Sequence, residues 1–381
     1  MRLRLAVISL TVALTTCACS TFDAINPFAG KGVKMAELKP FEASAQARVT
    51  WSESVGKGGN YVFSPAVSGS SVYAAGSDGS VIRIDDGQIV WKINAGQALS
   101  AGVGTDGKLV AVASPKGDVL VFSAADGTLA WKARATSEIL SPPAVGEDLV
   151  IVRSSDNCLA AYDVSDGKRR WLYQRPSPAL ALRNAAPPVI SGKYVFAGFP
   201  GGKLIAVSLN NGVSAWEGTV ALPKGTTELE RMADVSSLPV IAEHTVCAVA
   251  FQGRVACFDL NNGNLRWARD ISSSVGLAMD SRYLFVTDDK GAVHALDLGS
   301  GSSVWKQDAL SMRSVSAPLP RRGLVAVADI QGVVHFLNRE DGAFAARLNT
   351  DGSPVLASPQ ALGRNLVVQT GKGALYAIEA E

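Results

Sequence analysis

The sequence predicts an all-β fold, an eight-bladed β-propeller built from four-stranded antiparallel blades. Three observations support this: a recurring phrase of a turn followed by tryptophan, a strand motif that occurs eight times, and a small-residue segment before most units. A repeat of about 40 residues with several short strands per copy is typical of propellers. The phrases are DDGQIVW, ADGTLAW, SDGKRRW, NNGVSAW, NNGNLRW and GSGSSVW, which end at Trp91, Trp131, Trp171, Trp216, Trp267 and Trp305.

Each unit contains four expected strands, named A to D. Strand A is a short segment, usually of small residues and proline, and strand B is the β-rich run that follows it. Asp-Gly and Asn-Gly pairs separate strand C from strand D, because a tight hairpin needs positive φ and glycine supplies it without strain. The eight copies of strand C begin at Gly79, Gly117, Asn157, Gly202, Gly253, Gly291, Gly332 and Gly373.

The tryptophans are expected to be structural. Each lies on the outer strand D, where one bulky ring per unit can wedge between neighbouring blades. The phrase EDGAFAA is the exception, since Ala346 stands in the tryptophan position. Phe344, two residues earlier, is the candidate to replace the missing ring.

The ring is expected to close through its N-terminal strand. The last unit, GALYAIEAE, ends at strand C, whereas the chain from residue 46 begins with a spare strand, ARVTWSESV, that carries Trp51. Pairing these two strands would complete the eighth blade and remove the open sheet edges. The propeller is therefore assigned to residues 46–381.

The first 18 residues predict a lipoprotein signal peptide. Arg2 and Arg4 precede the apolar run LAVISLTVAL, which is too short to span a membrane, and small residues lead into cysteine. We assign the lipidated residue to Cys19, with Cys17 as the alternative site and a plain secretory signal as the alternative interpretation. Residues 19–45 are expected to be a flexible tether between the lipid and the propeller.

The net charge and the motifs of the chain give no sign of a catalytic, metal-binding or nucleic-acid-binding site. A net charge of +2 gives no electrostatic case for nucleic-acid binding. No metalloprotease, nucleophile-elbow, P-loop or paired-cysteine motif occurs, so we expect no catalytic residue, cofactor or metal. His294 and His335 occupy the same strand position in two units, which favours a structural role. Cys247 and Cys257 are expected on one hairpin, offset by one residue and facing opposite sides, hence free and buried.

Two connections between blades are much longer than the others, YQRPSPALALRNAAPP (173–188) and EGTVALPKGTTELERMADVSSLP (217–239). Both lie between strand D of one unit and strand A of the next, so they should emerge side by side on one face. Leucines beside opposite charges suit a protein-binding patch. The alternative is that the two loops pack on each other, with Arg183 bridging to Asp234. The residues alone do not separate these interpretations.

With its lipobox, its tether and the segments LALRNAAPPV and TELERMADVSSLPVI, the chain resembles the BamB family of outer-membrane lipoproteins. The resemblance implies a non-enzymatic periplasmic scaffold without a cofactor, anchored by lipid to the outer membrane. It implies binding to the POTRA domains of BamA, through it to the rest of the assembly complex, and a role in inserting unfolded β-barrel precursors. Matched residue by residue, the implied partner contacts are Leu180, Leu182, Arg183 and Asp234; Ser236 stands where relatives often have a second Asp.

The repeat also resembles quinoprotein dehydrogenases that use pyrroloquinoline quinone, which gives the alternative of a dehydrogenase or a degenerate relative. Those enzymes carry two adjacent cysteines joined by a disulfide and a calcium site of carboxylate and asparagine ligands. The chain has no adjacent cysteines and no obvious calcium cluster. This departure puts cofactor use in doubt.

Overall fold

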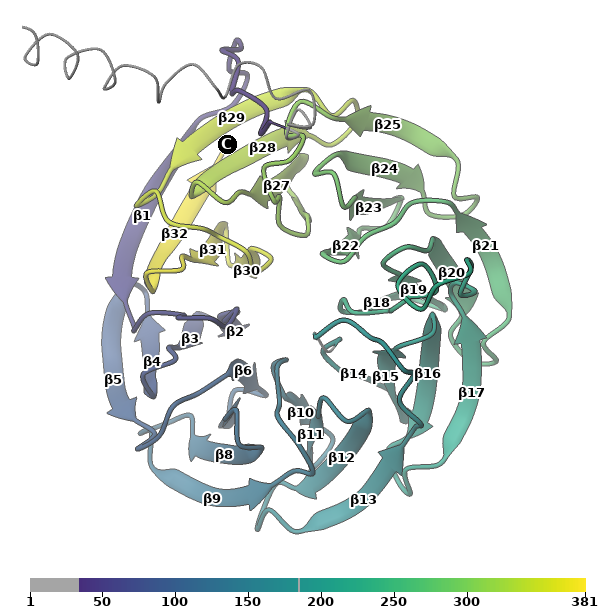
Figure 1. Ribbon diagram of the computed structural model, residues 1–381. Helices are drawn as coiled ribbons and strands as arrows, with labels where there is room; N and C mark the ends of the chain where they lie inside the picture. Colours follow the sequence, from purple (N-terminus) through teal and green to yellow (C-terminus); the bar gives the residue numbers. More distant parts are fainter. Residues whose placement is uncertain (1–33, 184–185) are drawn as a thin grey trace, which may run out of the picture. The chain divides into compact units, whose positions relative to one another are not determined.

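Thirty-two strands in eight four-stranded antiparallel sheets form a closed ring in the computed structural model, which describes residues 34–183 and 186–381 (Figure 1). The predicted all-β, eight-bladed propeller is confirmed. Within the described residues there is no helix, and therefore none that is long and apolar enough to cross a membrane. The signal peptide and Cys19 lie outside these residues.

Each blade runs from an innermost strand A to an outermost strand D. The A strands are β2 (Ala66–Ser68), β6 (Ala101–Thr105), β10 (Ala144–Gly146), β14 (Val189–Ser191), β18 (Val240–Ala242), β22 (Gly276–Met279), β26 (Leu319–Arg321) and β30 (Gln360–Leu362). The B strands are β3 (Ser71–Ala75), β7 (Leu109–Ala113), β11 (Leu149–Arg153), β15 (Tyr194–Phe199), β19 (Thr245–Val249), β23 (Tyr283–Thr287), β27 (Leu324–Ala328) and β31 (Asn365–Gln369).

The C strands are β4 (Ser80–Asp85), β8 (Asp118–Ser123), β12 (Cys158–Asp163), β16 (Lys203–Ser208), β20 (Val255–Asp259), β24 (Val293–Asp297), β28 (Val333–Asn338) and β32 (Ala374–Ala380). The D strands are β5 (Gln88–Asn94), β9 (Leu129–Arg134), β13 (Arg169–Gln174), β17 (Ser214–Thr219), β21 (Leu265–Arg269), β25 (Ser303–Gln307), β29 (Phe344–Asn349) and, in blade 8, β1 (Ala47–Ser54).

The hydrophobic core lies between blades. Eight clusters of buried side chains each join two neighbouring sheets, one cluster at every interface of the ring. The B and C strands are apolar along most of their length because a neighbouring blade covers each of their faces. In the D strands of blades 1 to 6 the tryptophan is buried or half-buried, and its neighbours in the strand are exposed except for the half-buried Ala268.

The recurring phrase joins adjacent blades. The indole N–H of Trp131 in blade 2 donates to the carbonyl of Val164 in blade 3 at 2.7 Å, and the ring packs under the turn glycine Gly167 of that blade. The glycine of each phrase thus receives the tryptophan of the preceding blade, while its own tryptophan reaches into the next. The other indole-to-carbonyl bonds are Trp91–Ala124, Trp171–Leu209, Trp216–Leu260, Trp267–Leu298 and Trp305–Arg339.

The ring closes where the tryptophan is missing. The N-terminal strand β1 pairs with β32 as predicted, from Ala47 opposite Ala380 to Ser54 opposite Ala374. Strands C and D of blade 8 come from opposite parts of the sequence and are not joined by a turn. Blade 8 therefore has no turn glycine under which a ring from blade 7 could pack. Alanine at 346 fits that absence.

Phe344 does not replace the missing ring. Its side chain packs with the cluster between blades 6 and 7 and against Phe41 at 5.5 Å between ring centroids. Ala346, by contrast, belongs to the cluster between blades 7 and 8. A register shift in the pairing of β28 with β29 separates the two residues. The prediction assumed that side chains two residues apart on a strand face the same side, and this shift breaks that alternation.

The expected tether is partly attached to the ring. The Ala36 N–H donates to Ser311 at 2.9 Å, the Arg347 guanidinium donates to the Lys39 carbonyl at 3.2 Å, and the Ser44 N–H donates to Ala345 at 3.0 Å. Residues 36–45 thus follow blade 7 down to β1, and the compact unit begins at Ala36 instead of residue 46. The aromatic contact of Phe41 holds this segment in place.

The expectation of free cysteines at 247 and 257 is wrong. Cys247 and Cys257 lie directly opposite each other on β19 and β20 and form a disulfide, with Cα atoms 4.1 Å apart. The hairpin turn from Ala250 to Arg254 aligns the strands without the assumed one-residue offset, so both side chains face the same side. Cys158 is free and buried.

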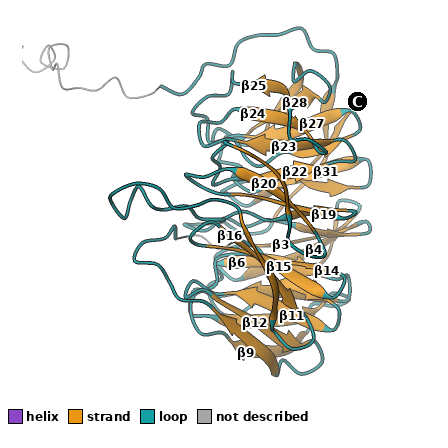
Figure 2. Ribbon diagram, turned by 90° about the vertical axis from the view of Figure 1, so that its right-hand side faces the viewer, coloured by secondary structure: helices purple, strands orange, loops and turns teal. Residues whose placement is uncertain are grey.

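The ring has two faces that we name by their loops. The connector face carries the D-to-A connections and the turns between strands B and C. The hairpin face carries the turns between strands A and B and between strands C and D. Figure 2 shows the two longest connections projecting from one side of the ring.

Candidate protein-binding surface

The two long connections lie on the connector face at adjacent positions of the ring. The first joins β13 of blade 3 to β14 of blade 4, and the second joins β17 of blade 4 to β18 of blade 5. Their placement side by side follows the prediction. Asn184 and Ala185, in the first connection, lie outside the described residues.

The first connection exposes part of the predicted patch. Leu180 is 42% exposed, Leu182 is half-buried, and the side chain of Arg183 is 67% exposed. Arg183 forms an ion pair with Glu138 at 2.7 Å, and Glu138 belongs to the connection between blades 2 and 3. Two successive connections therefore meet at this point.

Asp234 is buried instead of lying at the surface of the predicted patch. It is 3% exposed, and its carboxylate accepts the N–H of Leu182 at 2.7 Å and the N–H of Gly201 at 3.2 Å. It forms no ion pair with Arg183, which pairs with Glu138 instead. Asp234 therefore holds the leucine–arginine segment in place from beneath and does not itself face solvent.

The second connection is anchored at its C-terminal end and projects at its tip. Met232, Ala233 and Val235 are buried, Ala233 and Val235 in the cluster between blades 4 and 5. The Phe251 N–H donates to the Asp234 carbonyl at 2.9 Å. This buried stretch fixes the loop to the ring.

At the tip of the second connection, the Glu230 carboxylate accepts the backbone N–H groups of Thr226 at 2.9 Å and Thr227 at 3.1 Å. These bonds, with that to Thr227 first, lower the pKa of Glu230 because they stabilise its charged form. The tip is therefore a defined turn that keeps its negative charge.

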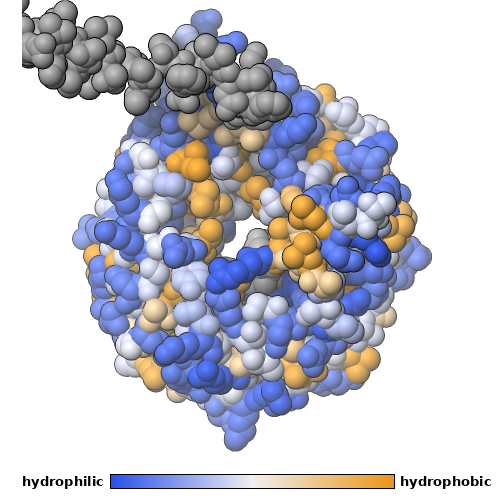
Figure 3. Space-filling model, in the orientation of Figure 1, coloured by the Kyte–Doolittle hydropathy of each residue, from blue (hydrophilic) through white to orange (hydrophobic). Residues whose placement is uncertain are grey.

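Exposed leucines accompany the charges. Leu222, Leu229 and Leu238 of the second connection are 64%, 60% and 44% exposed. Figure 3 shows hydrophobic surface beside the central opening on this face, over the region of β18. Exposed apolar side chains next to paired charges are typical of protein-binding surfaces.

A buried arginine supports the patch. The Arg153 guanidinium donates to Gly198 and to Asn157 and stacks on the Phe199 ring at 4.2 Å. Burial lowers the pKa of Arg153 to about 10, and the negative charge of Asp234 opposes this shift. At neutral pH Arg153 is charged, so it stabilises the buried Asp234 carboxylate. Arg153 was not among the residues predicted from the sequence, although an arginine at the end of an apolar B strand is a visible signal.

The histidines have structural partners. His294 lies 2.9 Å from Asp288 and His335 lies 3.1 Å from Asp329, in each case the aspartate before strand C of the same blade. Among the described residues no group of three or more histidine, cysteine or acidic side chains could hold a metal. The residues also do not fit a quinone cofactor of the dehydrogenase type, since Cys247 and Cys257 form a cross-strand disulfide instead of an adjacent pair.

Together, the repeat and the closed ring define an eight-bladed β-propeller that carries two long connections side by side on one face. The family profile described as outer membrane protein assembly factor BamB matches residues 77–307. BamB of Bordetella pertussis is 43% identical over 97% of this chain and 96% of its own, and BamB of Burkholderia pseudomallei is 43% identical over 89% and 90%. The chain belongs to the BamB family of outer membrane protein assembly factors.

The fold agrees with a solved relative. The crystal structure of BamB from Moraxella catarrhalis superimposes with a TM-score of 0.82 at 24% identity and covers 88% of this chain and 100% of that one. At this identity the agreement concerns the architecture alone. The assignment to the family rests on the sequence matches.

Proposed function

We propose that the protein is a non-enzymatic scaffold of the outer-membrane β-barrel assembly machinery. Its partners are the POTRA domains of BamA and, through them, the rest of the assembly complex, and it assists the insertion of unfolded β-barrel precursors. The names of the relatives, outer membrane protein assembly factors, support this role over the alternative of a quinone-dependent dehydrogenase. A lipid on Cys19 would hold it at the periplasmic face of the outer membrane.

The observation that carries the proposal is an exposed leucine–arginine pair on a rigid support. Leu180 and Arg183 reach solvent, whereas Asp234 and Arg153 beneath them are buried. A surface whose loop is held in place before binding loses less conformational entropy when the partner docks. Leu180 supplies the apolar contact, Arg183 supplies the charge, and Leu182 and Asp234 position them.

The Arg183–Glu138 ion pair gives a direct test. Arg183→Glu should reduce co-purification with BamA at least about tenfold, because we assign Arg183 as a hot spot, and loss of a hot-spot residue costs about 2 kcal/mol or more, whereas about 1.4 kcal/mol already equals tenfold in affinity. Lys108→Glu, an exposed lysine in the turn between β6 and β7 on the hairpin face, is the matched control and should retain the partner.

A double variant separates partner contact from loop packing. In Arg183→Glu with Glu138→Arg the charges are exchanged and the intramolecular ion pair can form again. If Arg183 contacts the partner, the double variant stays defective. Restored binding would mean that Arg183 only organises the loops, and unchanged binding in folded Arg183→Glu would remove the proposed surface altogether.

A further inference from the structure

The segment before β1, residues 36–45, lies along the outer strand of blade 7, and we call it the strap. Its first carbonyl, that of Ala36, accepts a hydrogen bond from the guanidinium of Arg313 at 2.9 Å. Further along, the carbonyl of Lys39 accepts a hydrogen bond from the guanidinium of Arg347 at 3.2 Å. Two arginines of the propeller therefore hold the backbone of the strap.

Arg347 also holds the strap by stacking. Its guanidinium carbon lies 4.9 Å from the ring centroid of Phe41, a strap residue, and 5.3 Å from that of Phe344 on β29. The two aromatic rings pack on each other at 5.5 Å between centroids. Movement of Arg347 would thus remove a hydrogen bond and a stacking contact from the strap together.

The two arginines are joined through a buried pair, Asp329 and His335, whose side chains are 0% exposed. The Asp329 carboxylate accepts a hydrogen bond from Nε of Arg313 at 2.6 Å and faces Nε2 of His335 at 3.1 Å. The other imidazole nitrogen, Nδ1, accepts a hydrogen bond from Nε of Arg347 at 3.2 Å. His335 is therefore the link between the carboxylate and the arginine that stacks on the strap.

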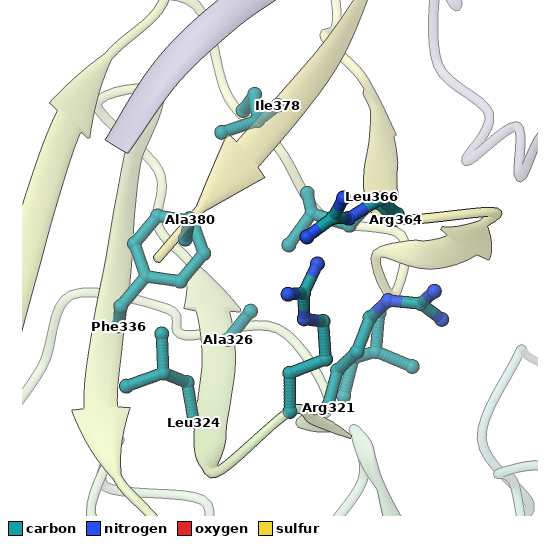
Figure 4. Close-up of a pocket in the computed structure, with 10 residues that line it drawn as sticks. Arg321, Leu324, Ala326, Phe336, Arg364, Leu366, Ile378 and Ala380 are labelled. Carbon is teal, nitrogen blue, oxygen red and sulfur yellow. The ribbon is translucent and has the colours of Figure 1, made fainter. Parts of the chain in front are cut away.

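The imidazole of His335 faces blade 6. It lies 6.0 Å from the ring of Phe344, measured between centroids, and Phe344 packs with the cluster between blades 6 and 7. The next residue of β28, Phe336, lines a pocket with Leu366 and Ile378 of blade 8 instead (Figure 4). Successive side chains of a strand face opposite sides, so the two positions agree.

Three charged groups face this imidazole. They are the carboxylate of Asp329 from the turn before β28, the guanidinium of Arg313 from the connection between blades 6 and 7, and that of Arg347 from β29. Blade 6 contributes apolar side chains of the shared cluster. The charged side chains of the strap are exposed, namely Glu37, Lys39 and Glu42. Burial and the two arginines lower the pKa of His335 and outweigh the carboxylate, so the imidazole is neutral at pH 7.

Protonation of His335 would remove the acceptor that Arg347 uses. A protonated imidazole carries an N–H on both nitrogens, so Nδ1 can no longer accept a hydrogen bond. Three positive groups would then surround the single carboxylate of Asp329. Arg313 is 2% exposed and stays buried, whereas Arg347 is half-buried and can turn toward water.

We propose that His335 is a pH-sensitive latch that holds the strap on blade 7. At neutral pH the unprotonated imidazole keeps Arg347 against the strap, and protonation in acid releases Lys39 and Phe41. Release exposes the imidazole to water, so proton uptake and release of the strap are linked. The equilibrium constant for release therefore rises as the pH falls below about 6.5, by at most about tenfold per pH unit for one proton. Acid thus uncovers Phe344 on the outer strand of blade 7.

Fluorine NMR of the full chain, with 4-fluorophenylalanine incorporated in place of Phe41, tests the latch. At about pH 7.5 we expect one main resonance from the packed ring. A second resonance, at the position of fluorophenylalanine exposed to water, should grow between about pH 6.5 and 5. In His335→Gln this resonance should not depend on pH, because a glutamine amide takes up no proton in that range. His294→Gln removes the corresponding histidine of blade 6 and should keep the wild-type response.

Two outcomes would overturn the proposal: an unchanged acid response in folded His335→Gln, or a wild-type resonance that stays single down to about pH 5. Near-UV circular dichroism confirms that each protein is still folded at the lowest pH. If His335→Gln does not fold, Arg347→Gln decides, because it removes the guanidinium that contacts Lys39 and Phe41. The exposed resonance should then predominate already at about pH 7.5, and a packed ring in this variant would show that the strap does not depend on the latch.

Discussion

The carboxylate of Asp234 accepts the backbone N–H of Leu182 at 2.7 Å, across 52 residues of sequence. This bond connects the two long loops of the connector face and places one acidic side chain below the surface that the other loop exposes. The contribution of Asp234 to partner binding is thus indirect: it fixes the backbone on which Leu180 and Arg183 stand.

Removing that carboxylate should loosen the first loop. Asp234→Ala leaves the N–H groups of Leu182 and Gly201 without their acceptor, and an unsatisfied buried group costs about 1–3 kcal/mol. We expect lower stability in urea and faster proteolysis in the segment 176–183. Asp166→Ala, in an exposed turn on the hairpin face, is the control and should leave cleavage of this segment unchanged. Unaltered proteolysis in Asp234→Ala would contradict the positioning role.

The glycine of the recurring phrase should tolerate no side chain. In Gly167→Ala the new Cβ would lie 2.6 Å from Cε3 of Trp131, at a φ of +69°. Gly192→Ala has a similar φ of +54° but nothing within 4 Å, so it isolates the cost of backbone strain. We expect Gly167→Ala to unfold at lower urea concentration than Gly192→Ala, by a further ~1–3 kcal/mol of overpacking. Equal losses in both variants would show that the indole contact adds nothing.

The disulfide of blade 5 should contribute to stability in an oxidising compartment. For a loop closed by residues ten apart, chain entropy predicts about 3 kcal/mol, which Cys247→Ala with Cys257→Ala should lose. Reductant should lower the stability of the wild-type protein by a similar amount and leave that of the double variant unchanged. Cys158→Ala is the control and should keep its response to reductant. Differential alkylation followed by mass spectrometry reports the thiol state directly.

His335 should make stability depend on pH. Burial lowers the pKa of His335 below 6.5, and this outweighs the opposing effect of Asp329. Arg347 donates to Nδ1 at 3.2 Å, which leaves the proton on Nε2 facing Asp329. Below about pH 7 the unfolded chain therefore takes up a proton that the folded chain does not. Stability falls with decreasing pH, by at most ~1.4 kcal/mol per unit.

The pH effect of His335 has its own window and control. The pKa of Asp329 is also lowered, because hydrogen bonds from His335, Val333 and Arg313 outweigh burial. Its contribution is present above the unfolded pKa of 3.8 and is lost only as the pH falls below that value. The free energy of unfolding, measured in urea between about pH 7 and 5, should thus depend less on pH in His335→Gln than in the wild-type protein. His244→Gln, an exposed control, should keep the wild-type dependence. The same slope in all three proteins would assign the dependence to other groups.

Repetition made the fold predictable. Glycine and tryptophan recur at fixed spacing in six phrases, and the spare strand around Trp51 indicated how the ring closes. The spacing could not reveal that each indole packs under the glycine of the following blade. The glycine and the tryptophan of one phrase do not contact each other, because the glycine contacts the preceding blade and the tryptophan contacts the next one. The register of β19 against β20 depended on one turn residue, and the prediction for the cysteines failed there.

The candidate surface was predictable in position but less so in role. Unequal lengths of the connections located the loops, and Leu180 and Arg183 are exposed as expected. Burial of Asp234 and the pairing of Arg183 with Glu138 depend on contacts between three different connections. Residue type and spacing within one loop contain no information about such contacts.

The hydrogen bond between Ala36 and Ser311 fixes the point where the N-terminal segment, residues 36–45, joins the ring. Ser311 lies in a connection between blades 6 and 7, so the chain enters on the same side as the projecting loops. The 17 residues from Ser20 to Ala36 reach at most roughly 60 Å when fully extended. If Cys19 carries the lipid, as we propose, this length sets an upper limit on the distance between the bilayer and the point where the chain joins the connector face.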